Sequence, residues 1–517
     1  MQAELCTLGI PREPWDFVQR AVQAGHPRSL AIHLSGDVKE MLKQNFADEP
    51  YKIIKERATF LKQWTVRCKE LEAQEQELHC SLEPHMREVL SGKRLLLFRE
   101  MLLALDYPDQ TLVDEISRGF QLSGWLPKSN VFPTTLKRPS RSMDAVQGMA
   151  KGLNKNIVKQ VAAAQDEELA TEVWELTAEE LEKGWAWIDE QCDGEKHVLA
   201  KRFGLRQGAK TRLIDDCSVG GFNSTCGSSE KLKIHAIDEM AAYIAWCLTT
   251  FGNSAMEGVV GKTYDLKNAY KQYGICAGDR SLLRIAVWNP ILKKVQFLGL
   301  NALPFGAVGS VSSFLRISMA IWYIGVRGLR LCWTAFFDDY TLLSKHACSN
   351  SASVAAESLF KLLGVDFAKE GKKAVPWGTQ VCSLGVKLDL ATVVDGETQI
   401  TIGHTESRVR ELSAALDSIE LSQVMSLKDA EKLRGRLQWF ETFAGGRVAQ
   451  QALRSLSRMA STGRKTEHLT MEEISTIRFL RERVICAPPT RISATSLSTW
   501  LVFTDGACEG EVSKLVL

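Results

Sequence analysis

Two adjacent carboxylates, Asp338 and Asp339, are the residues whose types and spacing most directly suggest chemistry. Bulky apolar residues precede them and another apolar run begins at Tyr340, so the pattern predicts a strand, a tight turn and a second strand. A turn can bring both acids to one edge of a sheet, where they repel each other unless a cation lies between them. Oxygen ligands of this kind suit Mg²⁺. The alternative interpretation is a hairpin whose turn merely contains two aspartates.

A third carboxylate, Asp265, ends another predicted strand upstream. The surrounding sequence, KTYDLKNAYKQYGI, predicts a strand, a turn and a short helix. Three carboxylates on neighbouring strand ends can hold two divalent cations, which activate an attacking oxygen and stabilise a leaving oxygen in phosphoryl transfer. The three aspartates are therefore the candidate catalytic and metal-binding residues.

A loop with the sequence LPFG, at 303–306, lies between the two acidic sites. Pro304, Gly306 and Gly309 mark the loop, and from Ser310 the apolar spacing becomes helical. Glycine would let the backbone approach a substrate closely. The loop lacks the Lys-Ser/Thr ending of a P-loop, so by itself it does not indicate a phosphate site.

Taken in this order, the stretch from Asp265 to Tyr270, the LPFG loop and the FFDD sequence at 336–339 resemble the motifs of retroelement reverse transcriptases. The LPFG form is the one seen in retrotransposons. The resemblance implies an α+β right-hand polymerase with fingers, a ferredoxin-like palm and a helical thumb or connection. It also implies RNA-directed DNA synthesis, with two Mg²⁺ ions, or Mn²⁺ in their place, held by the three aspartates.

The same resemblance implies a set of nucleotide-binding residues. The segment RQGAKTRLIDDCSVGGFNS at 206–224 is similar to a fingers segment whose basic residues hold the incoming triphosphate. Tyr270 would pack under the sugar and deny room to a 2′-hydroxyl, which separates this interpretation from an RNA-dependent RNA polymerase. The implied nucleotide-binding residues are Lys210, Arg212, Tyr270, Phe305, Gly306 and Lys372.

Residues that contact the primer and template are implied further along the chain. KEGKKAVPWGTQVCSLGVKLD at 369–389 resembles the last palm motifs, in which a Leu-Gly turn grips the primer. Between 428 and 465 there are nine basic and three acidic residues, and basic side chains in such a helical stretch can follow a duplex backbone. A solvated charged helix face is the alternative. The implied primer and template contacts are Phe336, Leu384, Gly385, Arg447 and Arg454.

The sequence LVFTDGACEG at 501–510 resembles the first strand of a ribonuclease H domain, with Asp505 as its first metal ligand. The further carboxylates that such a fold needs do not follow. We therefore expect a truncated start of that domain and no ribonuclease H activity, because one carboxylate cannot hold two cations.

Composition is that of an ordinary globular protein. The 517 residues are 45% hydrophobic and 24% charged, with a net charge of +2, so basic charge is local rather than general. The thirteen cysteines are scattered without CxxC or Cys/His zinc spacing, which argues against a structural zinc site. We expect reduced thiols and an intracellular protein, cytoplasmic or nuclear, with no membrane association.

The order of patterns predicts five regions. LTAEELEKGWAWIDE at 176–190 predicts a helix with its threonine as N-cap, and strands follow at 199–216. A regular alternation of strands and helices then continues to 389. The regions are a helical N-terminal part of unclear function at 1–165, fingers at 166–235, palm at 236–395, thumb or connection at 396–490, and the ribonuclease H start at 491–517.

The N-terminal region contains an apolar series at helical spacing, Leu61, Trp64, Cys68, Leu71 and Leu78, which Glu75 interrupts. A short dimerising coiled coil is one interpretation. An amphipathic helix pair that packs within its own domain is the favoured one, because there are so few heptads.

Two functions remain at this point. The first is a reverse transcriptase whose partners are an RNA template, a DNA or RNA primer and dNTPs. The second is a catalytically silent retroelement fragment that at most binds nucleic acid. The sequence leaves the oligomeric state open.

Overall fold

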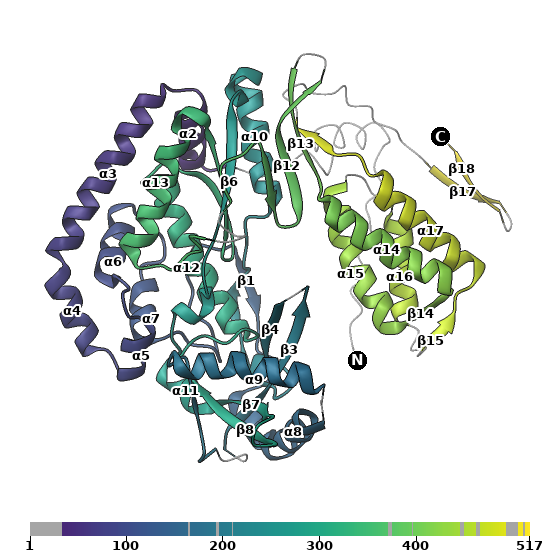
Figure 1. Ribbon diagram of the computed structural model, residues 1–517, viewed down its shortest axis with the longest axis horizontal. Coiled ribbons are helices and arrows are strands. Elements are labelled where there is room, and N and C mark those ends of the chain that lie inside the picture. The colour runs from purple at the N-terminus through teal and green to yellow at the C-terminus, as the bar shows by residue number, and fades with distance from the viewer. Residues whose placement is uncertain are drawn as a thin grey trace.

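The computed structural model describes residues 34–163, 166–192, 196–208, 210–370, 375–394, 397–444, 449–461, 466–492, 505–509 and 512–516. Helices and mostly antiparallel sheets are mixed along the chain, as the α+β expectation requires (Figure 1). Within these ranges, no helix combines the length and apolar character that crossing a membrane requires.

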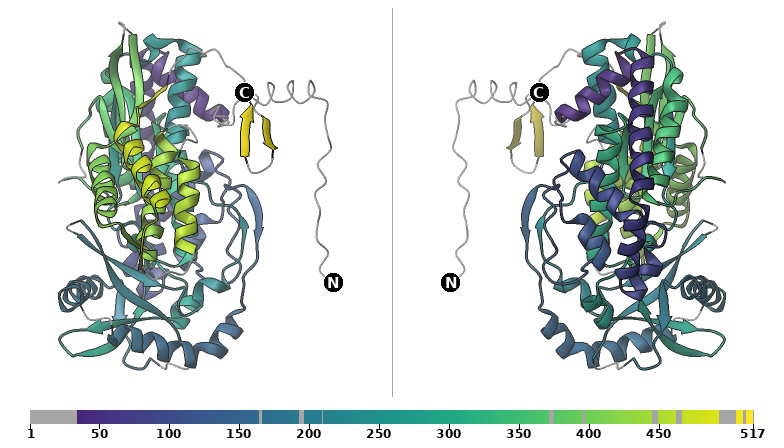
Figure 2. Two further views of the ribbon diagram at one scale, coloured as in Figure 1. Left: turned by 90° about the vertical axis from the view of Figure 1, so that its right-hand side faces the viewer. Right: turned by 90° about the vertical axis from the view of Figure 1, so that its left-hand side faces the viewer.

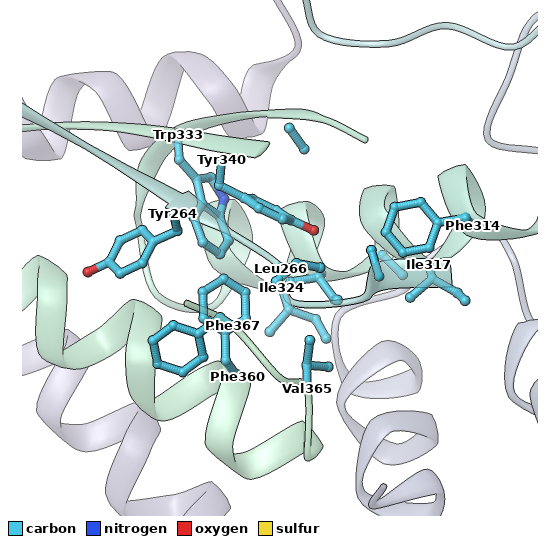
Figure 3. Close-up of a cluster of buried hydrophobic side chains, with 14 of the residues drawn as sticks. Tyr264, Leu266, Phe314, Ile317, Ile324, Trp333, Tyr340, Phe360, Val365 and Phe367 are labelled. Atoms are coloured by element: carbon cyan, nitrogen blue, oxygen red, sulfur yellow. The ribbon is translucent and has the colours of Figure 1, made fainter. Parts of the chain in front are cut away.

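The central sheet has three antiparallel strands in the order β6-β10-β9. Its strands are β6 (Val259–Asp265), β9 (Cys332–Phe336) and β10 (Asp339–Lys345). One face packs on α12 (Val308–Arg327) and α13 (His346–Leu363) through aromatic side chains. Figure 3 shows Tyr264, Trp333 and Tyr340 gathered over Phe360, and the Trp333 and Tyr340 ring centroids are 4.9 Å apart. This buried aromatic face fixes which side of the sheet is the core.

A five-stranded sheet, in the order β2-β8-β7-β3-β4, lies at one end of the central sheet (Figure 1). β3 pairs with β7 in parallel, and the other neighbours are antiparallel. Helices α8 and α9 pack on β3. The elements are α8 (Met143–Ala163), α9 (Glu167–Glu182), β2 (Ala186–Ile188), β3 (Val198–Gln207), β4 (Lys210–Asp216), β7 (Leu283–Asn289) and β8 (Lys294–Leu300).

The threonine N-cap expected within 176–190 is wrong. α9 begins ten residues earlier, at Glu167, where the Asp166 carboxylate accepts a hydrogen bond from the Leu169 backbone N–H at 3.2 Å. Thr177 lies inside the helix and donates its hydroxyl to the Val173 carbonyl at 2.7 Å. Threonine can satisfy itself this way within a helix, so its sequence position alone does not identify a start.

The N-terminal helices cover the outer side of α12 and α13 (Figure 2, right-hand view, in which α3 lies in front). The apolar series from Leu61 to Leu78 faces this intrachain core rather than solvent. Glu75, which interrupts the series, accepts hydrogen bonds from the backbone N–H groups of Leu95 (2.5 Å) and Leu96 (2.9 Å) at the start of α6. The amphipathic interpretation is therefore the one that the structure shows. The helices are α2 (Gly36–Phe46), α3 (Pro50–Glu70), α4 (Glu72–Ser81), α5 (Pro84–Val89), α6 (Leu95–Ala104) and α7 (Leu112–Arg118).

Several shorter elements connect these layers. β1 and β5 form a two-stranded sheet, and α10 packs on η2 and α2. The connecting elements are β1 (Thr134–Lys137), η1 (Phe222–Thr225), β5 (Ser228–Glu230), α10 (Ile237–Phe251), η2 (Asn253–Met256), η3 (Ala269–Gln272) and α11 (Ala277–Leu282).

The C-terminal part combines a four-stranded sheet, in the order β11-β12-β13-β16, with a helical unit that has its own hydrophobic core. A reciprocal capping box between Thr470 and Glu473 begins the last helix. The elements are β11 (Gln380–Ser383), β12 (Val386–Val394), β13 (Glu397–His404), α14 (Glu406–Ser422), β14 (Val424–Ser426), α15 (Leu427–Ala444), α16 (Gln450–Ser461), β15 (Thr466–His468), α17 (Met471–Cys486) and β16 (Thr490–Ile492).

Of the expected strand within 501–510, only Asp505–Glu509 lies among the described residues. Asp505 is the first residue of β17 (Asp505–Glu509), which pairs with β18 (Val512–Val516) as a hairpin. The side chain of Asp505 is not among those described.

Candidate active site

The three candidate aspartates are carried to one end of the central sheet. Asp265 is the last residue of β6 and Asp339 the first residue of β10, and the two are directly opposed in the antiparallel pair. Side chains at opposed positions share a face of the sheet. Asp338 is held next to them by a backbone hydrogen bond, in which its carbonyl oxygen accepts the N–H of Leu266 at 2.9 Å. Segments far apart in the sequence therefore place all three acids at one strand end.

The hairpin that carries Asp338 is held in an unusual backbone conformation. β9 and β10 are joined by the two residues Phe337 and Asp338, and Phe337 has a φ of +54°. A positive φ at the first loop residue is typical of hairpin turns that follow strand twist, but a bulky side chain adopts it only when its surroundings require it. The hydroxyl of Ser318, on α12, donates to the Phe337 carbonyl at 2.5 Å. The helix behind the sheet thus helps to hold the turn.

The donor chemistry of this strand end fits a divalent cation. All three aspartates are half-buried, so an ion could reach them from solvent. Their oxygens are the ligands that Mg²⁺ and Mn²⁺ accept. Within the described ranges, no three His, Cys, Asp or Glu side chains are already arranged as ligands of one ion. The strand end therefore brings the three acids together through its backbone, but their side chains as they stand do not form a three-ligand cation site.

Tyr270 lies beside these acids. It belongs to η3, which follows β6 after Asn268 takes a left-handed conformation with φ +51°. The Tyr270 ring stacks on Phe314 of α12, with centroids 4.9 Å apart and planes inclined by 26°, and meets Phe305 edge-on at 5.6 Å. Burial and the nearby Asp338 carboxylate raise the pKa of the Tyr270 hydroxyl above its ordinary value. The ring is thereby fixed between the LPFG loop and the acidic strand end.

The LPFG loop is seated against the end of β4. The Asp215 backbone N–H donates to the Phe305 carbonyl at 2.9 Å. Gly306 has a φ of +137°, and a Cβ there would lie 2.2 Å from the Asp215 carbonyl oxygen. Only glycine fits this approach. Phe305 itself is 42% exposed and remains available for a ligand.

Asn223 is a site residue that the sequence analysis did not single out. Its side-chain N–H donates to the Gly306 carbonyl at 3.0 Å, and its side-chain oxygen accepts the Val308 backbone N–H at 2.9 Å. One amide thus fixes the LPFG loop and the first turn of α12. Because it acts across more than eighty residues of sequence, no local pattern indicates this role.

The other expected nucleotide-binding residues have different positions. Lys210 and Arg212 lie on β4 as exposed side chains, two residues apart and so on one face of the hairpin. The last residues of the same strand contact the LPFG loop. Lys372 lies outside the described residues.

Leu384 and Gly385 form the two-residue turn between β11 and β12. Their φ values, +53° and +75°, are the pattern of a type I′ hairpin turn. The hydroxyls of Thr341 and Ser383 are 2.7 Å apart, which ties the turn to β10. A Cβ on Gly385 would lie 2.6 Å from the guanidinium of Arg408, at the start of α14. Arg408 is a cation beside this turn that the sequence analysis did not single out.

The remaining expected contacts are only partly described. Phe336 ends β9 next to the acidic turn, with its ring centroid 5.3 Å from that of Phe337. Arg454 is an exposed residue of α16, in the separate helical unit. Arg447 lies outside the described residues.

Comparisons with known proteins give a weak structural likeness. No family model matches the sequence, and no curated protein matches it. A foamy viral protease-reverse transcriptase dRH with double-stranded DNA has a TM-score of 0.43 and 13% identity, covering 77% of this chain and 62% of that one. The foamy viral protease-reverse transcriptase with an RNA/DNA hybrid has a TM-score of 0.43 and 12% identity, covering 81% and 46%. The same protein with double-stranded DNA has a TM-score of 0.42 and 14% identity, covering 81% and 72%. The chain thus spans less than two thirds of the first of these, and a likeness at this level assigns no function to it.

Proposed function

We propose that this chain is an RNA-directed DNA polymerase, a reverse transcriptase of a retrotransposon-type element. The observation that carries the proposal is the opposition of Asp265 and Asp339 together with the hydrogen bond from Leu266 to Asp338. Those contacts unite the three acids that the motif order singled out, beside Tyr270.

In this proposal, Asp265, Asp338 and Asp339 hold two Mg²⁺ ions. When bound there, the ions would supply activation of the primer 3′-hydroxyl and stabilisation of the leaving phosphate oxygen. Lys210 and Arg212 neutralise the triphosphate charge from the β3–β4 hairpin. Phe305 and Gly306 border the nucleotide.

The chain's own residues also account for substrate choice. Tyr270 is braced by Phe305 and Phe314, so its ring cannot readily move aside for a 2′-hydroxyl. The Leu384–Gly385 turn holds the primer, and Arg454 contacts the duplex backbone. In these terms β6, β9, β10, α12 and α13 form the palm, β3 and β4 the fingers, and α14–α17 the thumb.

Primer extension tests the proposal directly. Purified protein with a homopolymeric RNA template, a DNA primer, the complementary dNTP and Mg²⁺ should extend the primer, and Asp265→Asn should not. Extension with ribonucleotides in preference to deoxynucleotides would favour an RNA polymerase instead. Nucleic-acid binding without extension, in Mg²⁺ and in Mn²⁺, would favour the silent retroelement fragment.

A further inference from the structure

Four buried charged side chains form a continuous network next to the candidate site. Arg202, on β3, donates to both carboxylate oxygens of Asp215 on β4, at 2.7 and 3.0 Å. It also donates to Glu180 on α9 at 2.9 Å. Glu180 in turn forms an ion pair with Lys271 of η3 at 2.8 Å. We refer to Glu180, Arg202, Asp215 and Lys271 as the buried charge quartet.

The quartet is both enclosed and balanced. The side chains of Arg202 and Asp215 are 0% and 2% exposed, and those of Glu180 and Lys271 are 9% and 12% exposed. Two cations face two carboxylates. Burial alone would raise the pKa of Glu180, but Lys271 and Arg202 together hold it well below its usual range. Each of the four side chains therefore faces a partner of opposite charge.

Each end of the quartet leads to a different part of the proposed nucleotide-binding site. Lys271 is the neighbour of Tyr270 in η3. Asp215 contacts the LPFG loop through its own backbone, with its N–H on the Phe305 carbonyl and its carbonyl against Gly306. Asp215 also lies near the end of the strand that carries Lys210 and Arg212. One network thus reaches the Tyr270 ring, the LPFG loop and the basic hairpin.

We propose that the buried charge quartet positions the proposed nucleotide-binding residues, fixing Tyr270 relative to β4 and the LPFG loop. This inference rests on the proposed function, because it assigns the quartet to that nucleotide-binding site. Buried ion pairs of this kind contribute little net stability, but removing one member leaves an uncompensated charge. Such directional contacts hold α9, β3, β4 and η3 in one arrangement, which apolar packing alone would specify less strictly.

Lys271→Met is the informative variant, because it removes the contact nearest Tyr270 and leaves Arg202 paired with both carboxylates. We expect the KM for dNTP to rise about tenfold, with a smaller change in kcat and a weaker preference for dNTP over rNTP. Lys271→Arg keeps the charge and should restore most of the wild-type KM. The matched control is Lys183→Met, which removes an exposed lysine paired with Glu179, the α9 residue next to Glu180, at 3.3 Å. That control should leave KM and nucleotide preference unchanged.

Backbone hydrogen exchange gives a readout that needs no activity. In Lys271→Met, exchange should become faster at 266–272 and also at 303–308, across the quartet, and Lys183→Met should change neither. If wild-type protein extends primers but Lys271→Met keeps its KM and its nucleotide preference, the quartet is not a positioning device. If wild-type protein does not extend primers at all, the proposed function fails. In that case hydrogen exchange alone tests the positioning role of the quartet. If exchange in Lys271→Met becomes faster only at 266–272, the quartet does not hold η3 and the LPFG loop together.

Discussion

The backbone N–H of Leu266 donates to the carbonyl oxygen of Asp338 at 2.9 Å, so the two acid-bearing segments are joined without using a carboxylate. The side chains at this strand end can therefore be changed while the backbone that presents them stays in place. A substitution that removes one carboxylate charge therefore tests the chemistry of the site without disturbing this backbone contact.

Asp338→Asn should abolish primer extension while leaving the fold intact. Thermal melting should show an unchanged or slightly higher Tm, because one of three neighbouring like charges is removed. Asp114→Asn, on the surface of α7, is the control and should retain activity. Near-normal extension by Asp338→Asn in Mg²⁺ would remove this residue from the proposed metal site.

Tyr270→Ala should admit ribonucleotides. The ring that stacks on Phe314 is lost, which opens the space that a 2′-hydroxyl would occupy. The ratio of kcat/KM for dNTP to that for rNTP should fall by about tenfold or more. Tyr270→Phe keeps the ring and should keep the ratio. An equal ratio in the alanine variant would leave Tyr270 with a packing role only.

Gly306→Ala should damage the LPFG loop. A Cβ there would lie 2.2 Å from the Asp215 carbonyl oxygen, at a φ of +137° that alanine rarely adopts. We expect a loss of about 2 kcal/mol in the free energy of unfolding, together with a raised KM for dNTP. Gly278→Ala is the matched control, since a Cβ at that glycine meets nothing within 4 Å. Urea denaturation of both variants measures the difference, and equal stability would show that the loop accommodates a side chain.

His235 should make the protein sensitive to acid. Its ring accepts the Ala335 backbone N–H at 3.3 Å, one residue before β9 ends, and burial, with a smaller contribution from Lys233, lowers its pKa to about 3. The unfolded chain binds this proton below its ordinary pKa and the folded chain does not. Stability contributed by the neutral ring is therefore present above about pH 6.5 and is lost as pH falls toward 3.

By pH 5 this loss should reach about 2 kcal/mol in the free energy of unfolding. His235→Asn keeps an acceptor for Ala335 but cannot gain a proton. The stability difference between pH 7.5 and pH 5 should therefore be smaller in the variant by that amount. If the free energy of unfolding changes equally in both proteins between the two pH values, His235 is not the source of the acid sensitivity.

Removing Arg454 and Arg458 together should weaken duplex binding irrespective of sequence. The two lie four residues apart and are both exposed on α16, on one side of the helix. The slope of log Kd against log salt should fall by about one unit for each lost phosphate contact. Arg478→Ala, which removes an exposed arginine paired with Glu420 at 2.6 Å, is the control. An unaltered slope in the double variant would mean that this charged side of α16 is solvated and does not contact the duplex.

Local patterns were sufficient for the elements around the site. The apolar runs before Asp338 and after Asp339 predicted the hairpin, and the spacing from Ser310 predicted α12. That the strands of Asp265 and Asp339 are neighbours was a hypothesis from the residue types, and no local pattern gives their register, because strand partners are chosen by long-range packing. Asn223, Arg408 and the quartet could not be predicted, since each acts on residues distant in sequence. Thr177 shows where a local pattern misleads, because threonine is a favourable N-cap residue but this one lies inside a helix.

Arg57, on α3, is buried and donates to the carbonyl oxygens of Leu329 and Arg330, both at 3.0 Å, just after α12 ends. The N-terminal helices are thereby fastened to the element that also supports Phe337 and Tyr270. A shortened protein beginning at 166 would contain every motif but would expose the apolar backs of α12 and α13. The smallest unit suitable for recombinant expression is therefore longer than the segment that carries the motifs, and includes these helices.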